Sequence, residues 1–419
     1  MSNHIHSHHL ETLLIHGAYE PERITGATTP PIFQSTSFAY KTAEDLEAVF
    51  AGRELGYVYS RIGNPTVTAF EQRIAELEGG FGAVACSSGM AAISATVLAL
   101  AGAGDEIVSG NSIFAGTYSL FSQTLKRYGI TTRFVESTDI DSYRKVINER
   151  TKLIFLETIG NPKLDVPDIR AISEVARENE VPLVVDNTVT TPLLVQPKEL
   201  GADIVIHSTS KFINGHGNAI GGIVVDCGSF DWRNSRFNHL KLYSMKMGER
   251  AFLVYLRTQI CRDLGCCMSP FNAFLMCIGI ESLGVRIERH CSNALRVAEY
   301  LTHQRNVYDV RYPGLSNHPD HVVAARQFGD RYGALVTLKL PSKEDCFKFI
   351  NGLKLIQNLA NIGDAKTLVI HPASTFCRDL SDEERKSVGV SDNLVRISVG
   401  IEHVEDVIDD IHQSLETIK

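Results

Sequence analysis

A lysine flanked by serines follows a short apolar segment near the middle of the chain. Residues 204–207 read Ile-Val-Ile-His, Ser208-Thr209-Ser210-Lys211 comes next, and Gly215-His216-Gly217 follows shortly after. If 204–207 is a buried strand of a parallel sheet, Lys211 lies at the sheet edge where α/β proteins bind ligands. A desolvated lysine amine forms Schiff bases, and serine hydroxyls suit a phosphate. A surface lysine after a strand is the alternative, and this motif alone leaves both open.

An aspartate at the end of the preceding apolar segment favours the ligand site. Residues 181–186 read Val-Pro-Leu-Val-Val-Asp, and two neighbouring parallel strands would bring Asp186 and Lys211 to the same sheet edge. Pyridoxal 5′-phosphate (PLP) needs a lysine for its aldehyde and a carboxylate for its pyridinium nitrogen. The pair therefore predicts a PLP site, although an aspartate that opens a turn is the plainer interpretation of Asp186 alone.

Three further motifs could complete such a site. Ser87-Ser88-Gly89-Met90 joins an apolar segment to a helical one, and free N–H groups at a helix start bind phosphate. Tyr59-Ser60-Arg61 could clamp a phosphate, although such residues are more often only surface residues. Arg396 lies within the apolar segment 395–399, so it needs a partner, which is either a structural carboxylate or that of an amino-acid substrate.

Strands and helices in alternation must position these residues. Apolar segments rich in Val and Ile recur at 82–86, 105–108, 132–135, 153–157, 183–186 and 204–207, with helical patterns between several of them. This alternation predicts an α/β fold with a mainly parallel sheet. We expect an irregular N-terminal arm over 1–65 that contacts a neighbouring subunit, a PLP-binding domain over 66–270, and a smaller α/β C-terminal domain over 271–419 that opens with one long helix.

Composition narrows the class of protein. The 419 residues carry 41 Lys and Arg against 49 Asp and Glu, a net charge of −8, which argues against binding nucleic acid. We expect no membrane span, no secretory signal and a cytoplasmic location. The nine cysteines have no regular spacing and are expected to be reduced thiols. His4, His6, His8 and His9 could bind a metal, but we expect a disordered tip and no metal site.

Taken together, the motifs resemble the Cys/Met-metabolism family of PLP enzymes, which adopt fold type I. The resemblance runs from about Leu10 to Leu415 and is greatest for the O-acetylhomoserine sulfhydrylase (homocysteine synthase) branch. Besides the motifs above, it rests on Asp186-Asn-Thr188, Ser269-Pro-Phe-Asn-Ala-Phe274, the segment 359–368, Ile370-His-Pro-Ala-Ser374 and Val395-Arg-Ile-Ser-Val-Gly-Ile-Glu402.

The resemblance implies a role for each candidate residue. Lys211 would be the Schiff-base lysine and the proton shuttle, and Asp186 would pair with the pyridine nitrogen. The other implied cofactor contacts are Gly89, Met90, Ser208 and Ser210 at the phosphate, Phe114 on the ring, Asn161 near O3′, and Tyr59 and Arg61 at the phosphate of a neighbouring subunit. Arg396, with Asn361, would hold the substrate carboxylate, and Tyr59 is also a candidate for proton transfer.

The implied activity is that of a transferase in methionine biosynthesis. It would replace the acetate of O-acetylhomoserine by sulfide, which gives homocysteine, in a homotetramer built from dimers that share active sites. Sulfur could instead arrive on a small thiol or a carrier protein. O-succinylhomoserine sulfhydrylase, cystathionine γ-synthase and methionine γ-lyase activities remain alternatives on the same fold, and a non-catalytic binding protein is a further one.

The sequence departs from the family pattern around the expected pocket. Phe114 stands where most relatives carry a tyrosine, so the ring keeps its stacking surface but has no hydroxyl. Gly116 replaces the cysteine typical of methionine γ-lyases, which counts against that activity. Thr375-Phe376-Cys377 replaces the usual Thr-Thr-His or Met-Thr-His, which leaves the pocket mouth and substrate choice open.

Overall fold

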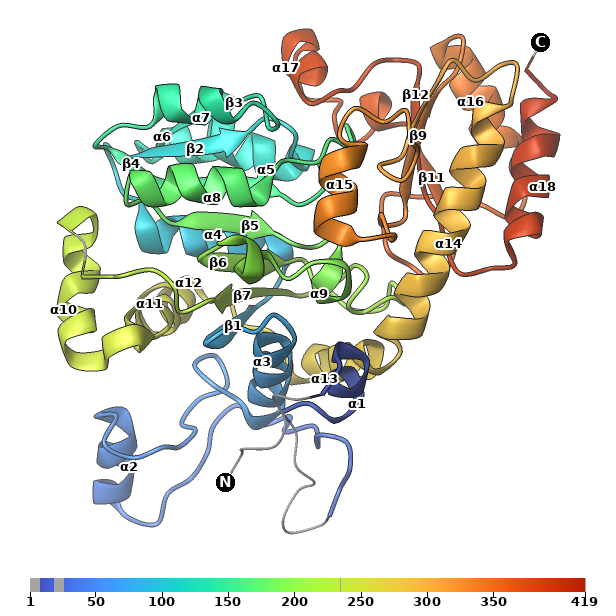
Figure 1. The fold of residues 1–419 in the computed structure, drawn as a ribbon. Helices are drawn as coiled ribbons and strands as arrows, with labels where there is room; N and C mark the ends of the chain where they lie inside the picture. The colour runs from blue at the N-terminus through green and yellow to red at the C-terminus, as the bar shows by residue number, and fades with distance from the viewer. Residues whose placement is uncertain (1–7, 19–25, 234, 419) are drawn as a thin grey trace.

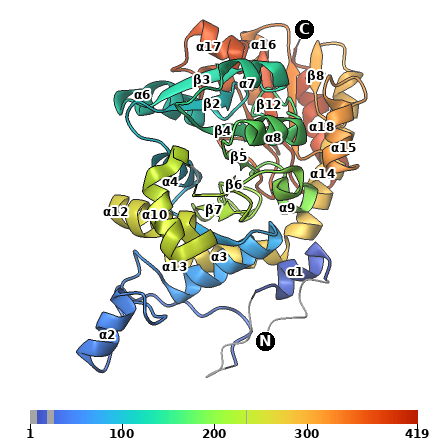
Figure 2. The same cartoon turned by 60° about the vertical axis from the view of Figure 1, so that its left-hand side comes forward.

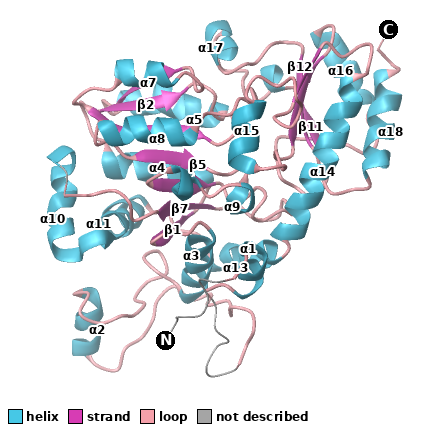
Figure 3. Ribbon diagram, viewed as in Figure 1, coloured by secondary structure: helices cyan, strands magenta, loops and turns pink. Residues whose placement is uncertain are grey.

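The computed structural model describes residues 8–18, 26–233 and 235–418. Two sheets of unequal size lie side by side with helices around them (Figures 1 and 3). His4 and His6 of the His-rich start, and the parts of the predicted arm in residues 1–7 and 19–25, lie outside the described residues.

Seven strands form the larger sheet, in the order β1-β7-β6-β5-β4-β2-β3. Their bounds are β1 Gly82–Cys86, β2 Glu106–Gly110, β3 Thr131–Val135, β4 Thr151–Glu157, β5 Leu183–Asp186, β6 Ile204–His207 and β7 Gly222–Asp226. Paired strands are parallel except at β7, which runs antiparallel to β1 and β6. The predicted α/β class with a mainly parallel sheet is therefore confirmed, whereas β7 was not expected.

Both faces of the larger sheet are buried. Along β5, Leu183 and Val185 join one apolar core with α3 (Pro65–Leu77) and α8 (Ile169–Glu178). Val184 points the other way, into a second core with α4 (Gly89–Leu100). Successive side chains of a strand alternate between faces, so a strand covered on both sides needs an unbroken apolar run. This requirement explains the run that the sequence shows.

Five strands form the second sheet, in the order β10-β11-β12-β9-β8. Their bounds are β8 Asp309–Arg311, β9 Leu335–Lys339, β10 Gln357–Asn358, β11 Leu368–Ile370 and β12 Leu394–Ser398. A third apolar core joins this sheet to α14 (Leu283–Thr302), α16 (Lys343–Gly352) and α18 (Val404–Leu415). In Figure 1 these helices lie along the outer side of the second sheet, and α14 leads to it from beside the larger one.

The long helix expected from residue 271 is broken. The structure has α13 (Pro270–Glu281) and then α14, bent by 64° at a break of a single residue, Ser282. The bend turns the chain from the larger sheet toward the second one. No single helix among the described residues is long and apolar enough to cross a membrane, and only this bent pair meets that test on length and composition.

The predicted irregular arm contains two helices. Helix α1 (Leu10–His16) buries Leu13 and Leu14, whereas α2 (Ala43–Phe50) buries none of its side chains. The Thr42 side chain accepts a hydrogen bond from Asp45 N at 3.1 Å and so caps α2. Figures 1 and 2 show α2 standing away from the rest of the chain. The expectation of a wholly irregular arm was wrong, and its contact with a neighbouring subunit stays a prediction.

Candidate active site

A cavity of about 790 Å³ lies where the C-terminal ends of the parallel strands meet the second sheet. Ten of the twelve candidate residues line it. They are Gly89, Met90, Phe114, Asn161, Asp186, Ser208, Ser210, Lys211, Asn361 and Arg396. The two candidates that do not line it are Tyr59 and Arg61. The structure thus brings together residues from four strand ends, one helix start and the second sheet.

Lys211 lies four residues beyond the end of β6 and reaches into the cavity. Its Nζ donates a hydrogen bond to Asn361 Oδ1 at 2.6 Å. Burial, reinforced by the Arg396 guanidinium, lowers the pKa of Lys211 from 10.5 to about 8. Both effects penalise the ammonium form. A sizeable share of the amine is therefore neutral near neutral pH, as a nucleophile or base requires.

Asp186 ends β5, which pairs in parallel with β6, so the predicted neighbourhood of Asp186 and Lys211 is correct. The Asp186 carboxylate accepts a hydrogen bond from Thr188 N at 2.9 Å. Burial raises the pKa of Asp186, and a nearby cation would compensate that cost. A protonated pyridine nitrogen is a cation of the required kind.

Glu157 lines the cavity, although its place in the sequence did not single it out as a site residue. It ends β4 and lies directly beside Asp186 in the strand register. Its Oε1 accepts a hydrogen bond from Phe114 N at 2.7 Å. Burial and the neighbouring Asp186 carboxylate raise the pKa of Glu157 well above its usual range. The available signal was its place at the end of an apolar strand, the same signal that identified Asp186.

The start of α4 forms one end of the cavity. The Ser88 side chain accepts from Ala91 N at 3.1 Å and caps the helix, and Ser88, Gly89 and Met90 line the cavity. A Cβ on Gly89 would lie 2.6 Å from Ser208 Cβ, so only glycine lets the helix start approach the segment after β6. The positive end of a helix dipole beside a serine hydroxyl suits a phosphate.

Arg396 enters the cavity from β12 of the second sheet. Its Nη1 donates to Asn161 Oδ1 and its Nη2 to Asn361 O, both at 3.0 Å. No carboxylate among the described residues pairs with it, and its Nε has no hydrogen-bond partner there. Burial lowers the pKa of Arg396 to about 10. Of the two partners that the sequence allowed, a structural carboxylate is therefore absent from the described part of the chain, and an anionic ligand remains.

Tyr59 and Arg61 lie outside the cavity of their own chain. The Tyr59 side chain is 41% exposed, and the Arg61 guanidinium stands 5.4 Å from its ring centre. Arg61 Nη1 also donates to Arg262 O at 2.5 Å. Their segment precedes α3, on the side of the molecule from which the arm projects (Figure 1).

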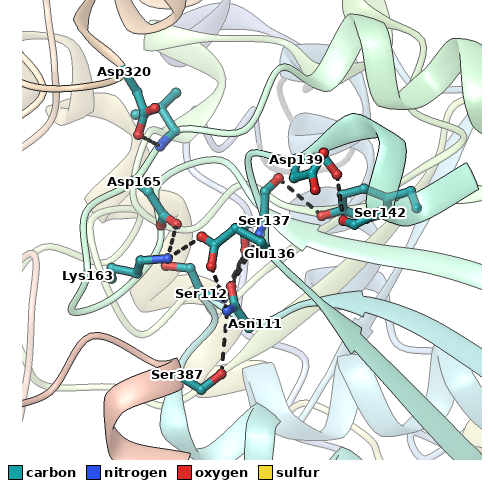
Figure 4. Close-up of polar contacts among 12 residues, drawn as sticks. Asn111, Ser112, Glu136, Ser137, Asp139, Ser142, Lys163, Asp165, Asp320 and Ser387 are labelled. Atoms are coloured by element: carbon teal, nitrogen blue, oxygen red, sulfur yellow. Dashed lines mark hydrogen bonds and ion pairs between the residues drawn. The ribbon is translucent and has the colours of Figure 1, made fainter. Parts of the chain in front are cut away.

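A polar cluster includes Lys163 and Asp165 of the segment between β4 and α8, which also carries Asn161 (Figure 4). Lys163 forms ion pairs with Glu136 and with Asp165, the latter at 3.1 Å between Nζ and Oδ2. Asn111 Nδ2 donates to Glu136 Oε2 at 3.0 Å and to Ser387 Oγ at 3.4 Å. Ser387 belongs to α17 (Asp382–Ser387), so the cluster ties that late segment to the loops after β2 and β3.

These features fit PLP. The cavity volume lies in the range of small-molecule sites, which is roughly 300–1,000 Å³. Lys211 offers an amine that burial keeps partly neutral, and the start of α4 a place for phosphate. Asp186 offers a buried carboxylate that forms no ion pair with the described residues. In the chemistry of this cofactor, each of these groups has a counterpart: aldehyde, ring nitrogen and phosphate.

Comparison with known proteins identifies relatives over nearly the whole chain. Residues 11–416 match the sequence family described as Cys/Met metabolism PLP-dependent enzyme. The O-acetyl-L-homoserine sulfhydrylase of Leptospira meyeri is 42% identical, over 97% of this chain and 97% of its own. The homocysteine synthase of Schizosaccharomyces pombe is 44% identical, over 98% and 99%. A Campylobacter jejuni crystal structure that contains N′-pyridoxyl-lysine-5′-monophosphate superposes with a TM-score of 0.94, at 34% identity, over 98% and 100%.

Proposed function

Because the chain belongs to the Cys/Met metabolism PLP-dependent enzyme family, we propose that it converts O-acetylhomoserine and sulfide to homocysteine and acetate. The observation that carries this proposal is the cavity itself. It places around one space a partly neutral lysine, a buried aspartate and an arginine with no carboxylate partner in the described part of the chain. The names of the relatives in Leptospira meyeri and Schizosaccharomyces pombe support the same reaction.

PLP is the cofactor. When bound, it would withdraw electrons from the substrate Cα, so that the hydrogens on Cα and Cβ become acidic. Lys211 is the residue to anchor its aldehyde, Asp186 its ring nitrogen, and Ser208 with the start of α4 its phosphate. Ser210 lines the same end, where its Oγ exchanges hydrogen bonds with Gly221. Phe114 offers a ring face and Asn161 a side-chain amide to the same space.

Lys211 is also the proposed proton carrier. Its Nζ, once free, would take the proton from Cα, give that proton up to the cofactor and, neutral again, take the proton from Cβ; the Cγ–O bond to acetate would then break. Sulfide forms the new Cγ–S bond, and protons returned to Cβ and Cα complete homocysteine. Arg396 and Asn361 hold the substrate carboxylate meanwhile, which keeps Cα and Cβ within reach of one flexible amine. Tyr59 of a neighbouring subunit is a second candidate for proton transfer.

The charges that line the cavity favour acetyl over succinyl substrates. Among its lining residues only Lys211 and Arg396 are cationic, and both already have proposed roles. Glu157 and Asp186 are the acidic residues, and Phe114 and Phe376 form an apolar wall beside Arg396. The second carboxylate of a succinyl group would lose water without gaining a cation, which is costly. The small neutral acetyl group meets no such penalty.

The assembly that we propose is a homotetramer of dimers that share active sites. Tyr59 and Arg61 are exposed and lie outside the cavity of their own chain. This position supports a role for them in the cavity of a neighbouring subunit. We place the enzyme in the cytoplasm, in methionine biosynthesis, with free sulfide or a sulfur carrier as donor and no nucleic-acid or membrane partner. The net charge of −8 supports the absence of a nucleic-acid partner.

Steady-state kinetics with O-acetyl- and O-succinylhomoserine in the presence of sulfide tests the proposal. We expect homocysteine from both, with kcat/KM at least about tenfold higher for the acetyl ester, since one unpaired carboxylate costs more than 1.4 kcal/mol. A preference for the succinyl ester would overturn the acetyl assignment. Rapid release of a thiol and α-ketobutyrate from methionine, with no homocysteine from either ester, would overturn the reaction.

A further inference from the structure

The Arg396 guanidinium lies over the face of the Phe376 ring. The Arg396 Cζ atom stands 5.0 Å from the centre of the Phe376 ring. The two hydrogen bonds to Asn161 Oδ1 and Asn361 O hold the edge of the same group. The hydrogen bonds hold two of its nitrogens, and the ring contact adds a third restraint on how the guanidinium can turn.

Phe376 is held in turn by Phe114. The two ring centres lie 6.1 Å apart with the planes inclined at 37°, and both rings line the cavity. A Cβ on residue 116 would lie 2.5 Å from Phe114 Cε1, so Gly116 leaves the space into which the Phe114 ring folds. Residues 114, 116 and 376, where the sequence departs from the family pattern, thus form one series of contacts, and Phe376 links it to Arg396.

An aromatic ring can partly compensate the buried charge of Arg396. It is 4% exposed, and no carboxylate among the described residues pairs with it. Burial without a counter-ion lowers its pKa to about 10. The negative face of an aromatic ring partly compensates a buried cation and is most effective where water is excluded. An aliphatic side chain of similar bulk excludes water but offers no such face.

We propose that Phe376 is a positioning residue that fixes the Arg396 guanidinium in the orientation that receives the α-carboxylate of the substrate. The inference rests on the proposed function only in taking the ligand to be an α-amino acid. It assigns to an aromatic side chain near the pocket mouth a share of the affinity and selectivity for a free carboxylate.

The test compares the holoenzyme with F376L, which keeps apolar bulk but not the aromatic face, and with F376A. Binding of unreactive L-norvaline and of its carboxamide is followed by the absorbance of the bound cofactor. We expect the Kd for L-norvaline to rise roughly 2- to 30-fold in both variants, the range of one cation–π contact, and the Kd for the amide to change less than about twofold. F347L is the matched control, because Phe347 carries a similar contact, 5.7 Å from Lys343 Nζ, outside the cavity.

Two outcomes would overturn the inference. If F376L binds L-norvaline like the wild type, the aromatic face is irrelevant and only bulk matters. If acid and amide lose affinity equally, Phe376 is a wall for the side chain of the ligand. With O-acetylhomoserine we expect a higher KM and a nearly unchanged kcat, since the carboxylate contact is the same throughout the reaction. Should L-norvaline behave as expected while no homocysteine forms, the proposed reaction fails and this inference stands.

Discussion

At Lys211, burial and a neighbouring cation act in the same direction. Both disfavour the ammonium form and lower the pKa of Lys211 to about 8. At pH 7 roughly a tenth of the side chains are then neutral, against less than about a thousandth for a lysine of pKa 10.5. The fold thus supplies the reactive form of the amine, and it does so before any cofactor is bound.

This pKa predicts how the cofactor-free protein reacts with PLP. Because only the neutral amine attacks an aldehyde, the uptake rate should rise about tenfold per pH unit below pH 8 and level off above it. R396L should move the inflection to higher pH, since it removes the neighbouring cation. Stopped-flow absorbance measures both profiles. An inflection near 10.5, or no inflection, would contradict the assignment of a depressed pKa.

At the scale of one strand, β7 ends at a buried aspartate, Asp226, whose charged form is unfavourable there. The residue is fully buried, and its Oδ1 accepts from Gly228 N at 2.9 Å, whereas Oδ2 has no partner in the described part of the chain. Burial, together with the nearby Asp203 carboxylate, raises the pKa of Asp226 to about 7. The native state therefore keeps a proton that the unfolded chain releases above pH 3.8.

The sign of this shift predicts a loss of stability as the pH rises. Between about pH 4 and 7 the free energy of unfolding should fall by up to roughly 4 kcal/mol because of Asp226, with little change above pH 7. D226N should lack this fall and so be more stable than the wild type at pH 8, but not at pH 4. Urea unfolding at several pH values tests this. D379N, at an 83% exposed side chain, is the control, and equal slopes for wild type and D226N would refute the prediction.

Strand ends could be predicted from the sequence, and the contacts between sheets could not. Asp186 and Lys211 follow apolar runs in a parallel sheet, so their neighbourhood follows from local pattern alone. Arg396 meets Asn161 across 235 residues, and that contact depends on how the two sheets lie relative to each other. Strand β7 escaped prediction because its apolar run is short and lies between glycines. Glu157 escaped because a glutamate at a strand end is also compatible with a solvated loop.

At the scale of the whole molecule, the cavity lacks the two candidates that lie on the arm side. Tyr59 and Arg61 are exposed, and α2, which precedes them in the arm, buries no side chain in its own chain. In each chain, ten candidate residues thus line the cavity, and the other two lie on the surface outside it. In a symmetric dimer, such an arrangement completes both sites by exchange.

Mixing two inactive variants tests this exchange. K211A removes the lysine and R61A the proposed phosphate contact, each in a different chain of the shared site. After dissociation and random reassociation of equal amounts, about a quarter of the sites should carry both intact residues and regain activity. Unmixed variants are the controls for residual activity. If the mixture is no more active than the average of its components, the sites do not share these residues.

The aromatic wall of Phe114 and Phe376 has a consequence for how the enzyme can change by mutation. The proposed preference for a neutral acyl group rests on the finding that Lys211 and Arg396 are the only cations among the described residues that line the cavity. No single-base change in either phenylalanine codon yields lysine, arginine or histidine; it yields only neutral residues. A lineage that carries this wall therefore cannot acquire a charge for a dicarboxylic ester at these positions in one step. The genetic code, as well as the fold, therefore limits how quickly the substrate preference can change at these two positions.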